Sequence, residues 1–228
     1  MASLAYQTKK DSATIKNDVV TNIMKMLADR KWILHENIQS NVNEIMKNKN
    51  DDNVYTIKLD VKLANLETYD PSEDKTKWKN FNDNTIALLF VQQKINTKIQ
   101  SIMDFISKYT NMHKIIIGEE VTERGRHLIM QQTNSRSIEV FMEHEFLMNL
   151  LEHVCSPKYE ILSQIDADKM REDYNATKRQ MPKMYDNDTA ARYFYLKKNQ
   201  TVRIIRNTEN TAESIAYRYI SHKGNTAM

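Results

Sequence analysis

Three short apolar runs, separated by two segments with helical features, limit the fold of this chain more than any other part of its sequence. The runs are TIALLFVQ, HKIIIG and SIEVFM, all between residues 85 and 142. Isoleucines recur at helical spacing from Ile95 to Ile106, and the segment VTERGRHLIMQQ predicts a turn and a short helix. Strands that alternate with helices form a sheet with helices packed on its faces.

The sequence before these runs predicts two helices and one strand. Apolar residues at helical spacing predict helices over residues 12–29 and around residues 38–46. Apolar and polar residues then alternate from Tyr55 to Leu63, which predicts a strand with one buried face. The polar segment 67–84 is typical of a surface loop.

The sequence after the runs predicts a second, smaller group of elements. We expect a strand after Pro157, a helix capped by Asp166, a short helix capped by Asp188, and a hairpin near the C-terminus. The predicted fold class is α/β (α+β), with an N-terminal domain over residues 1–146 and a C-terminal domain over residues 147–228.

Composition excludes several classes of function. No apolar run is long enough to cross a bilayer, and the N-terminus lacks the apolar core of a signal peptide. The single cysteine, Cys155, allows no internal disulfide and no cysteine-rich zinc site, which is typical of a reducing compartment. Only three glycines are present, at spacings that fit neither the dinucleotide-binding fingerprint nor the P-loop. We therefore expect no cofactor and no small-molecule substrate.

Positive charge gathers at the C-terminus. The chain as a whole carries a net charge of +3, but residues 189–228 hold seven basic and two acidic side chains, an excess of five positive charges. Such a module suits an anionic partner, either a nucleic acid or an acidic protein surface. A solvated charged surface would give the same pattern.

One pair of residues suggests an enzyme. Asp60 and Lys62 lie two residues apart on the predicted strand, and metal-dependent nucleases of the restriction-enzyme type use such a pair. These sites also need a second carboxylate on a neighbouring strand, and the sequence offers none. His144 and His153 lack a third ligand at metal-binding spacing, so we expect no metal site.

Two arginines, Arg124 and Arg126, lie on either side of a glycine at the start of a predicted helix. Helix N-termini and arginines both favour phosphate, so these side chains are candidates for contact with a nucleic-acid backbone. Solvated arginines are the simpler alternative.

The C-terminal third resembles a known family. The segments that carry the similarity are QMPKM, Asp188-Thr-Ala-Ala-Arg-Tyr-Phe, LKKNQTVRIIRNTENTAES and IAYRY. They are similar to the C-terminal domain of the fifth subunit shared by the eukaryotic nuclear RNA polymerases. This subunit has an archaeal counterpart that lacks the jaw domain. Upstream, KMLADRKWI, IALLFV and HKIIIG follow one another in the same order as similar segments of the eukaryotic jaw domain. The resemblance therefore indicates a eukaryotic-like form of the subunit or the form of a large DNA virus.

The resemblance implies a non-catalytic polymerase subunit. It implies a jaw domain of restriction-enzyme-like fold near downstream DNA and a C-terminal assembly domain docked on the largest subunit. It also implies that the protein lies in the nucleus, or in a virus factory or virion. A nuclease using Asp60 and Lys62, or a free nucleic-acid-binding module, remains the alternative. The residues that we expect to contact other subunits are His153, Pro157, Met181, Pro182, Arg192, Tyr193, Arg206, Glu209, Tyr217 and Arg218.

The chain departs from the family at two turns. Tyr195 and Asn199 stand where the family usually has glycine. Asparagine tolerates a left-handed backbone, whereas tyrosine does so only with strain.

Overall fold

The structure is a computed structural model that describes residues 12–47, 53–63, 66, 82–92, 94–95, 100–132, 137–153, 155–208 and 212–221. The chain divides into two compact units, and the second begins at Asn149 and also takes in the segment that follows Asp60. Most of the predicted loop over residues 67–84 lies outside the described residues. None of the helices in the described ranges is long and apolar enough to cross a membrane.

The first unit contains a four-stranded mixed sheet between layers of helices. Its strand order is β1-β2-β3-β4, with β1 antiparallel to β2 and the other neighbours parallel. The predicted fold class is therefore confirmed for this unit. Its elements are α1 (Ser12–Asp29), η1 (His35–Asn37), α2 (Ile38–Lys47), β1 (Val54–Lys58), β2 (Asn82–Val91), α3 (Gln100–Lys108), β3 (Met112–Gly118), α4 (Glu123–Gln132), β4 (Ile138–Met142) and η4 (Glu143–Phe146).

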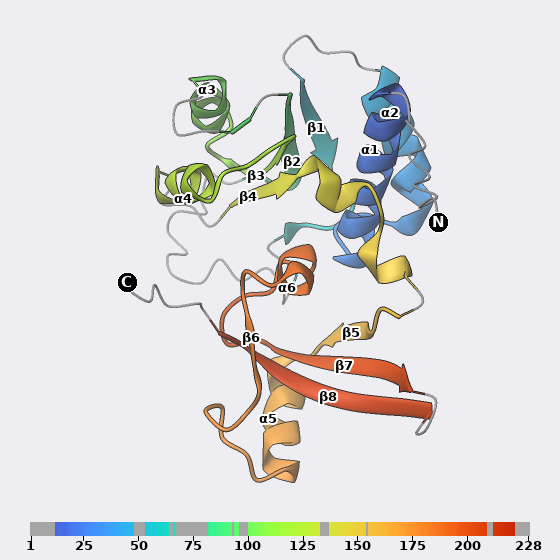
Figure 1. The fold of residues 1–228 in the computed structure, drawn as a ribbon, viewed down its shortest axis with the longest axis vertical. Coiled ribbons are helices and arrows are strands. Elements are labelled where there is room, and N and C mark those ends of the chain that lie inside the picture. The colour runs from blue at the N-terminus through green and yellow to red at the C-terminus, as the bar shows by residue number, and fades with distance from the viewer. Residues whose placement is uncertain are drawn as a thin grey trace, which may run out of the picture. The chain divides into compact units, whose positions relative to one another are not determined.

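The connections decide which helices cover which face of this sheet. The chain passes from β2 through α3 to β3, and from β3 through α4 to β4, always toward the same edge. Right-handed crossovers in one direction place both helices on one face, and Figure 1 shows α3 and α4 together there, with α1 and α2 on the opposite side. Ile102 of α3 and Ile129 of α4 pack in one core with Ile116 of β3.

Two predictions in the first unit were wrong. The strand predicted over residues 55–63 ends at Lys58, because the chain bends at Asp60 and leaves the sheet. Ile95, predicted on a helix, is fully buried, forms an isolated parallel bridge with Val121 and lies outside α3 (Gln100–Lys108). Periodicity could not separate an apolar residue just after a strand from the first turn of a helix.

The second unit is built on a smaller sheet of order β5-β7-β8-β6. β7 and β8 form an antiparallel hairpin, β5 pairs antiparallel with β7, and β6 pairs parallel with β8. Figure 1 shows α6 and α5 on opposite sides of this sheet. The elements are η5 (Leu150–Glu152), β5 (Lys158–Ile161), α5 (Gln164–Asp173), β6 (Lys183–Tyr185), α6 (Thr189–Tyr193), β7 (Thr201–Thr208) and β8 (Ala212–Ser221).

The helix caps of the second unit differ in part from expectation. Asp188 caps α6 as predicted, since its carboxylate accepts the N–H of Ala190 at 3.0 Å. The cap of α5 is Ser163 instead of Asp166, because the Ser163 hydroxyl accepts the Asp166 N–H at 3.1 Å and donates to the Asp166 carboxylate at 2.7 Å.

Candidate partner-binding surfaces

The two arginines of the first unit lie in the first turn of α4. Thr122 caps this helix, since its hydroxyl accepts the N–H of Gly125 at 3.1 Å and donates to the carbonyl of Ile95 at 3.1 Å. A Cβ atom on Gly125 would lie 2.8 Å from the Ile95 carbonyl oxygen, so only glycine permits this close approach. The segment after β2 therefore fixes the start of α4.

The structure does not make the two arginines equivalent. Arg124 is exposed. The side chain of Arg126 is only 17% exposed, and its Nη2 lies 3.8 Å from Oε1 of Glu145. Arg124 is thus the better placed of the two for contact with an outside anion.

Asp60 has a structural role. Its Oδ2 accepts the backbone N–H of Leu34 at 2.8 Å and the side-chain amide of Asn37 at 2.9 Å, so it holds the connection between α1 and α2. Because β1 ends before it, Asp60 and Lys62 do not share a strand face as the nuclease hypothesis required. No group of three or more His, Cys, Asp or Glu suited to a metal ion occurs in the part of the chain that the structure describes.

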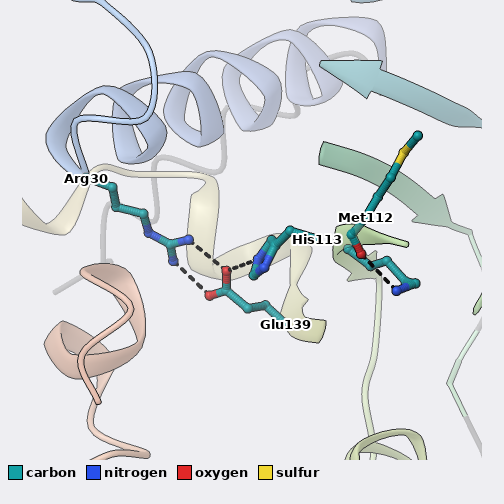
Figure 2. A network of polar contacts seen from close by, with 5 residues as sticks. Arg30, Met112, His113 and Glu139 are labelled. Atoms are coloured by element: carbon teal, nitrogen blue, oxygen red, sulfur yellow. Dashed lines mark hydrogen bonds and ion pairs between the residues drawn. The ribbon is translucent and has the colours of Figure 1, made fainter. Parts of the chain in front are cut away.

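Sequence reasoning missed a buried polar cluster of three residues, which Figure 2 shows. Two guanidinium nitrogens of Arg30, just after α1, donate to the two carboxylate oxygens of Glu139 on β4, at 2.7 and 2.8 Å. His113 on β3 places Nε2 2.8 Å from Oε1 of the same carboxylate. The Trp32 ring covers the cluster, 5.0 Å from the His113 ring and 4.9 Å from the guanidinium carbon.

The cluster keeps Glu139 ionised inside the protein. Burial alone would raise its pKa, but the charge of Arg30 and the hydrogen bonds from His113 and Arg30 outweigh burial and lower the pKa to about 2. A signal was present in the sequence, because Glu139 interrupts an apolar strand and His113 opens another. The pairing itself was hidden, since Arg30 and Glu139 lie 109 residues apart.

Lys114 is a second buried charge, on the sheet face that α3 and α4 cover. It is 1% exposed, and its Nζ donates to the Met112 carbonyl at 2.9 Å (Figure 2). Burial lowers the pKa of this amine to about 8. This charged strand residue, which precedes three isoleucines, therefore lies in the interior of the first unit and not on its surface.

In the second unit, two of the expected docking residues share one face of the sheet. Side chains alternate along the hairpin, so Arg206 and Arg218 project on the same face as Ile204 and Ile220, the face on which α6 packs. Burial raises the pKa of the Tyr159 phenol and the charge of Asp188 adds to the rise, while Arg206 and Arg218 oppose it. Tyr159 pairs with Ile204 across β5 and β7, so this phenol lies on the same face of the sheet as the two arginines.

The remaining expected docking residues are spread over the second unit. His153 and Pro182 are exposed, and Pro157, Arg192, Tyr193 and Tyr217 are partly exposed. The His153 ring accepts the N–H of Cys155 at 3.2 Å, and the Pro182 carbonyl accepts the N–H of Tyr219 at 2.9 Å. Met181 is only 6% exposed, so its side chain packs inside the unit, and its contact with a partner stays a prediction. Glu209 lies outside the described residues.

These features define a class of protein. The carboxylates of Asp60 and Glu139 serve in structural hydrogen bonds. Exposed arginines and tyrosines lie instead on a helix start and on an incompletely covered sheet. The arrangement is that of an α+β protein with charged and aromatic side chains exposed on its surface.

Comparison with known proteins finds similarity to one group of proteins. Residues 148–220 match the family described as "RNA polymerase Rpb5, C-terminal domain". The chain is 27% identical over 205 residues to the DNA-directed RNA polymerase subunit 5 of Acanthamoeba polyphaga mimivirus, covering 90% of this chain and 98% of that protein. It is 23% identical over 199 residues to the subunit rpabc1 of RNA polymerases I, II and III from Dictyostelium discoideum, covering 86% and 92%.

A plant protein matches over a shorter range. The DNA-directed RNA polymerase subunit 5-like protein 1 of Arabidopsis thaliana is 29% identical over 105 residues, which is 46% of this chain and 50% of that protein. The chain is thus similar, along most of its length, to fifth subunits of DNA-directed RNA polymerases from a eukaryote and from a giant virus.

Proposed function

We propose that this chain is a non-catalytic subunit of a multisubunit DNA-directed RNA polymerase, with its second unit docked on the largest subunit and its first unit serving as a jaw beside downstream DNA. The observation that carries the role is the match of residues 148–220 to the Rpb5 C-terminal domain, with relatives named as polymerase subunits along nearly the whole chain. The catalytic activity belongs to the complex.

The docking role is supported by the surface of the second unit. Arg206 is exposed and Arg218 partly exposed on one face of the hairpin, where they can meet acidic side chains of another subunit. Charged pairs that become desolvated at an interface typically cost about 2–5 kcal/mol when one partner is truncated. We also propose that residues 147–228 fold without the rest of the chain, since all four strands of the second sheet come from this segment.

The proposed DNA contact rests on Arg124. Its exposed side chain, in the first turn of α4, can approach a phosphate without reading base sequence. Arg126 contributes less, because it is largely covered and lies beside Glu145. The protein would lie where the polymerase works, in the nucleus of a cell or in a virus factory.

The experiment is to recover polymerase through a tagged chain and compare three versions. Arg206→Ala/Arg218→Ala should reduce the amount of largest subunit that co-purifies. Arg124→Ala should leave assembly intact and lower the salt slope of DNA binding by roughly 1 unit, and Lys47→Ala, another exposed cation of the first unit, is its matched control. Normal assembly of the double variant would contradict the docking surface.

A nuclease is the rival function, and the same material tests it. The purified chain should not cleave DNA with magnesium, and Asp60→Asn should leave the DNA unchanged. Cleavage by the native chain that this variant abolishes would favour the nuclease.

A further inference from the structure

The longest strand of the second unit extends well beyond the strand that covers its outer edge. β7 pairs with β8 along the hairpin, from Ala212 to Tyr219. On the other side of β8, β6 pairs only with Tyr219, Ile220 and Ser221. Among the described residues, no strand pairs with this outer side of β8 between Ala212 and Arg218.

The hydrogen bonds at the end of β8 show which backbone groups face this open edge. Ile220 donates its N–H toward the β7 side, to Gln200 O at 2.9 Å, and Tyr219 donates outward, to Pro182 O at 2.9 Å. The hairpin register has no shift from Thr201 to Thr208, so the directions alternate along the strand. The N–H and C=O groups of Glu213, Ile215 and Tyr217 therefore point outward, while those of Ala216 and Arg218 bond to β7.

The side chains along the open edge are not those that usually protect one. Natural edge strands are blunted by central charges, proline, bulges or a covering segment. Here the charges stand only at the two ends, Glu213 and Arg218, with no proline between. Ile215 in the middle is 52% exposed and lies opposite Ile205, and Tyr217 contacts the ring of Tyr174, which is itself 67% exposed.

We propose that an extended segment of another polymerase subunit pairs with the outer edge of β8, from Glu213 to Arg218, and completes the sheet as an added strand. The inference rests on the proposed function, because it names how the second unit is held. Backbone hydrogen bonds would supply the affinity of such a contact, and alternate side chains its specificity.

The two faces of the sheet define the chemistry of this segment. On the face that carries Ile215 and Tyr217, its side chains would be apolar, so that they cover the exposed isoleucine. On the opposite face lies Arg218, with Arg206 on the neighbouring strand, and there an acidic side chain would complement the two guanidinium groups. The partner segment is thus a strand of alternating apolar and acidic residues.

Amide hydrogen exchange tests the pairing directly, in the free full-length chain and in polymerase co-purified with the tagged chain. In the free chain, the outward amides of Ile215 and Tyr217 should exchange quickly and the inward amides of Ala216 and Arg218 slowly. In the complex, the outward amides should slow by roughly 100-fold or more while the inward amides change little. Fragmentation at single-residue resolution separates the two sets.

A matched pair of variants tests whether backbone or side chain holds the segment. Ile215→Pro removes one outward N–H without touching the bonds to β7, and Ile215→Thr removes the apolar side chain but keeps the N–H. The proline variant should lower the recovered complex by roughly tenfold and the threonine variant by less than about threefold. Inward-amide protection in each free variant shows that the hairpin is intact.

The outcomes separate this proposal from the function on which it rests. If the chain co-purifies with polymerase but the outward amides remain as fast as in the free chain, the added strand is wrong and the subunit role stands. If the free chain forms a dimer that already protects these amides, the edge pairs with a second copy and the proposal is also wrong. If no polymerase subunit co-purifies, the proposed function and this inference fail together.

Discussion

β3 in the first unit and β8 in the second are strands of four-stranded sheets with opposite surroundings. Every residue of β3 after Met112 is buried, because neighbouring strands flank it on both sides and helices cover both faces. Only Ile220 of β8 is buried, and most of the strand has a single neighbour. β3 is thus enclosed by its own unit, whereas no strand among the described residues pairs with the outer side of β8 between Ala212 and Arg218.

The same contrast holds for charged groups. In the first unit, Arg30, Glu139 and Lys114 are buried, and each has polar partners within the unit. In the second, Arg206 is exposed and Arg203 pairs with Glu160 at the surface. Buried polar interactions therefore help to hold the first unit together, while these arginines of the second unit lie at its surface.

The largest effect that we expect comes from breaking the buried cluster. Glu139→Leu leaves the Arg30 charge buried without its carboxylate, and should lower the stability of the first unit by about 3–5 kcal/mol. Native-state hydrogen exchange of the β3 amides measures this unit separately from the second.

The control is Arg30→Met/Glu139→Leu, which removes both charges. It should be more stable than the single variant, because no unpaired guanidinium remains. Equal losses in the two variants would show that packing, not charge pairing, dominates at this position.

Acid should weaken the first unit through Glu139. The folded pKa of Glu139 is lowered from 4.5 to about 2, so its contribution is complete above pH 4.5 and is lost as the pH falls toward 2. The shift corresponds to roughly 3 kcal/mol. Comparing the exchange of β3 amides at pH 6 and pH 3 between the native chain and Glu139→Gln isolates this carboxyl, and an identical loss in both would exclude it as the source.

Much of the fold could be predicted because local patterns determine it. Apolar runs of strand length and isoleucines at helical spacing located β2, β3, β4 and both flanking helices. Asp60 and Ile95 were misplaced because a bend and a single bridge depend on contacts with distant segments, the α1–α2 connection and Val121. The Arg30–Glu139–His113 cluster joins three parts of the chain and has no short motif, so periodicity could not reveal it.

An isoleucine-to-valine change, which removes one methylene, compares how tightly the side chains of the two sheets are packed. Ile116→Val on β3 should cost about 0.5–1.5 kcal/mol, because Ile116 is fully buried. Ile215→Val on β8 should cost less than about 0.5 kcal/mol in the free chain, because half of this side chain is in water. Exchange of amides in the same sheet reports each value, and a similar cost at both sites would mean that Ile215 is covered in solution.

The smallest effect concerns a strained turn in the second unit. Tyr195 has a φ of 55° and Asn199 a φ of 76°, so both are left-handed, at the two positions where glycine was expected from the resemblance. Asparagine tolerates this conformation, but a tyrosine Cβ does not. The Tyr195 ring has some compensation, since Nζ of Lys197 lies 3.2 Å from its centre.

Comparing Tyr195→Gly with Tyr195→Ala isolates the strain, because both variants lose the ring and differ only in the Cβ atom. The glycine variant should be the more stable by about 0.5–1 kcal/mol, since relief of the left-handed Cβ exceeds the added chain entropy of glycine in the unfolded state. Exchange of the inward amides of β7 and β8 measures both. An alanine variant as stable as the glycine variant would mean that the turn relaxes to a negative φ once the ring is gone, and that the tyrosine itself imposes the left-handed conformation.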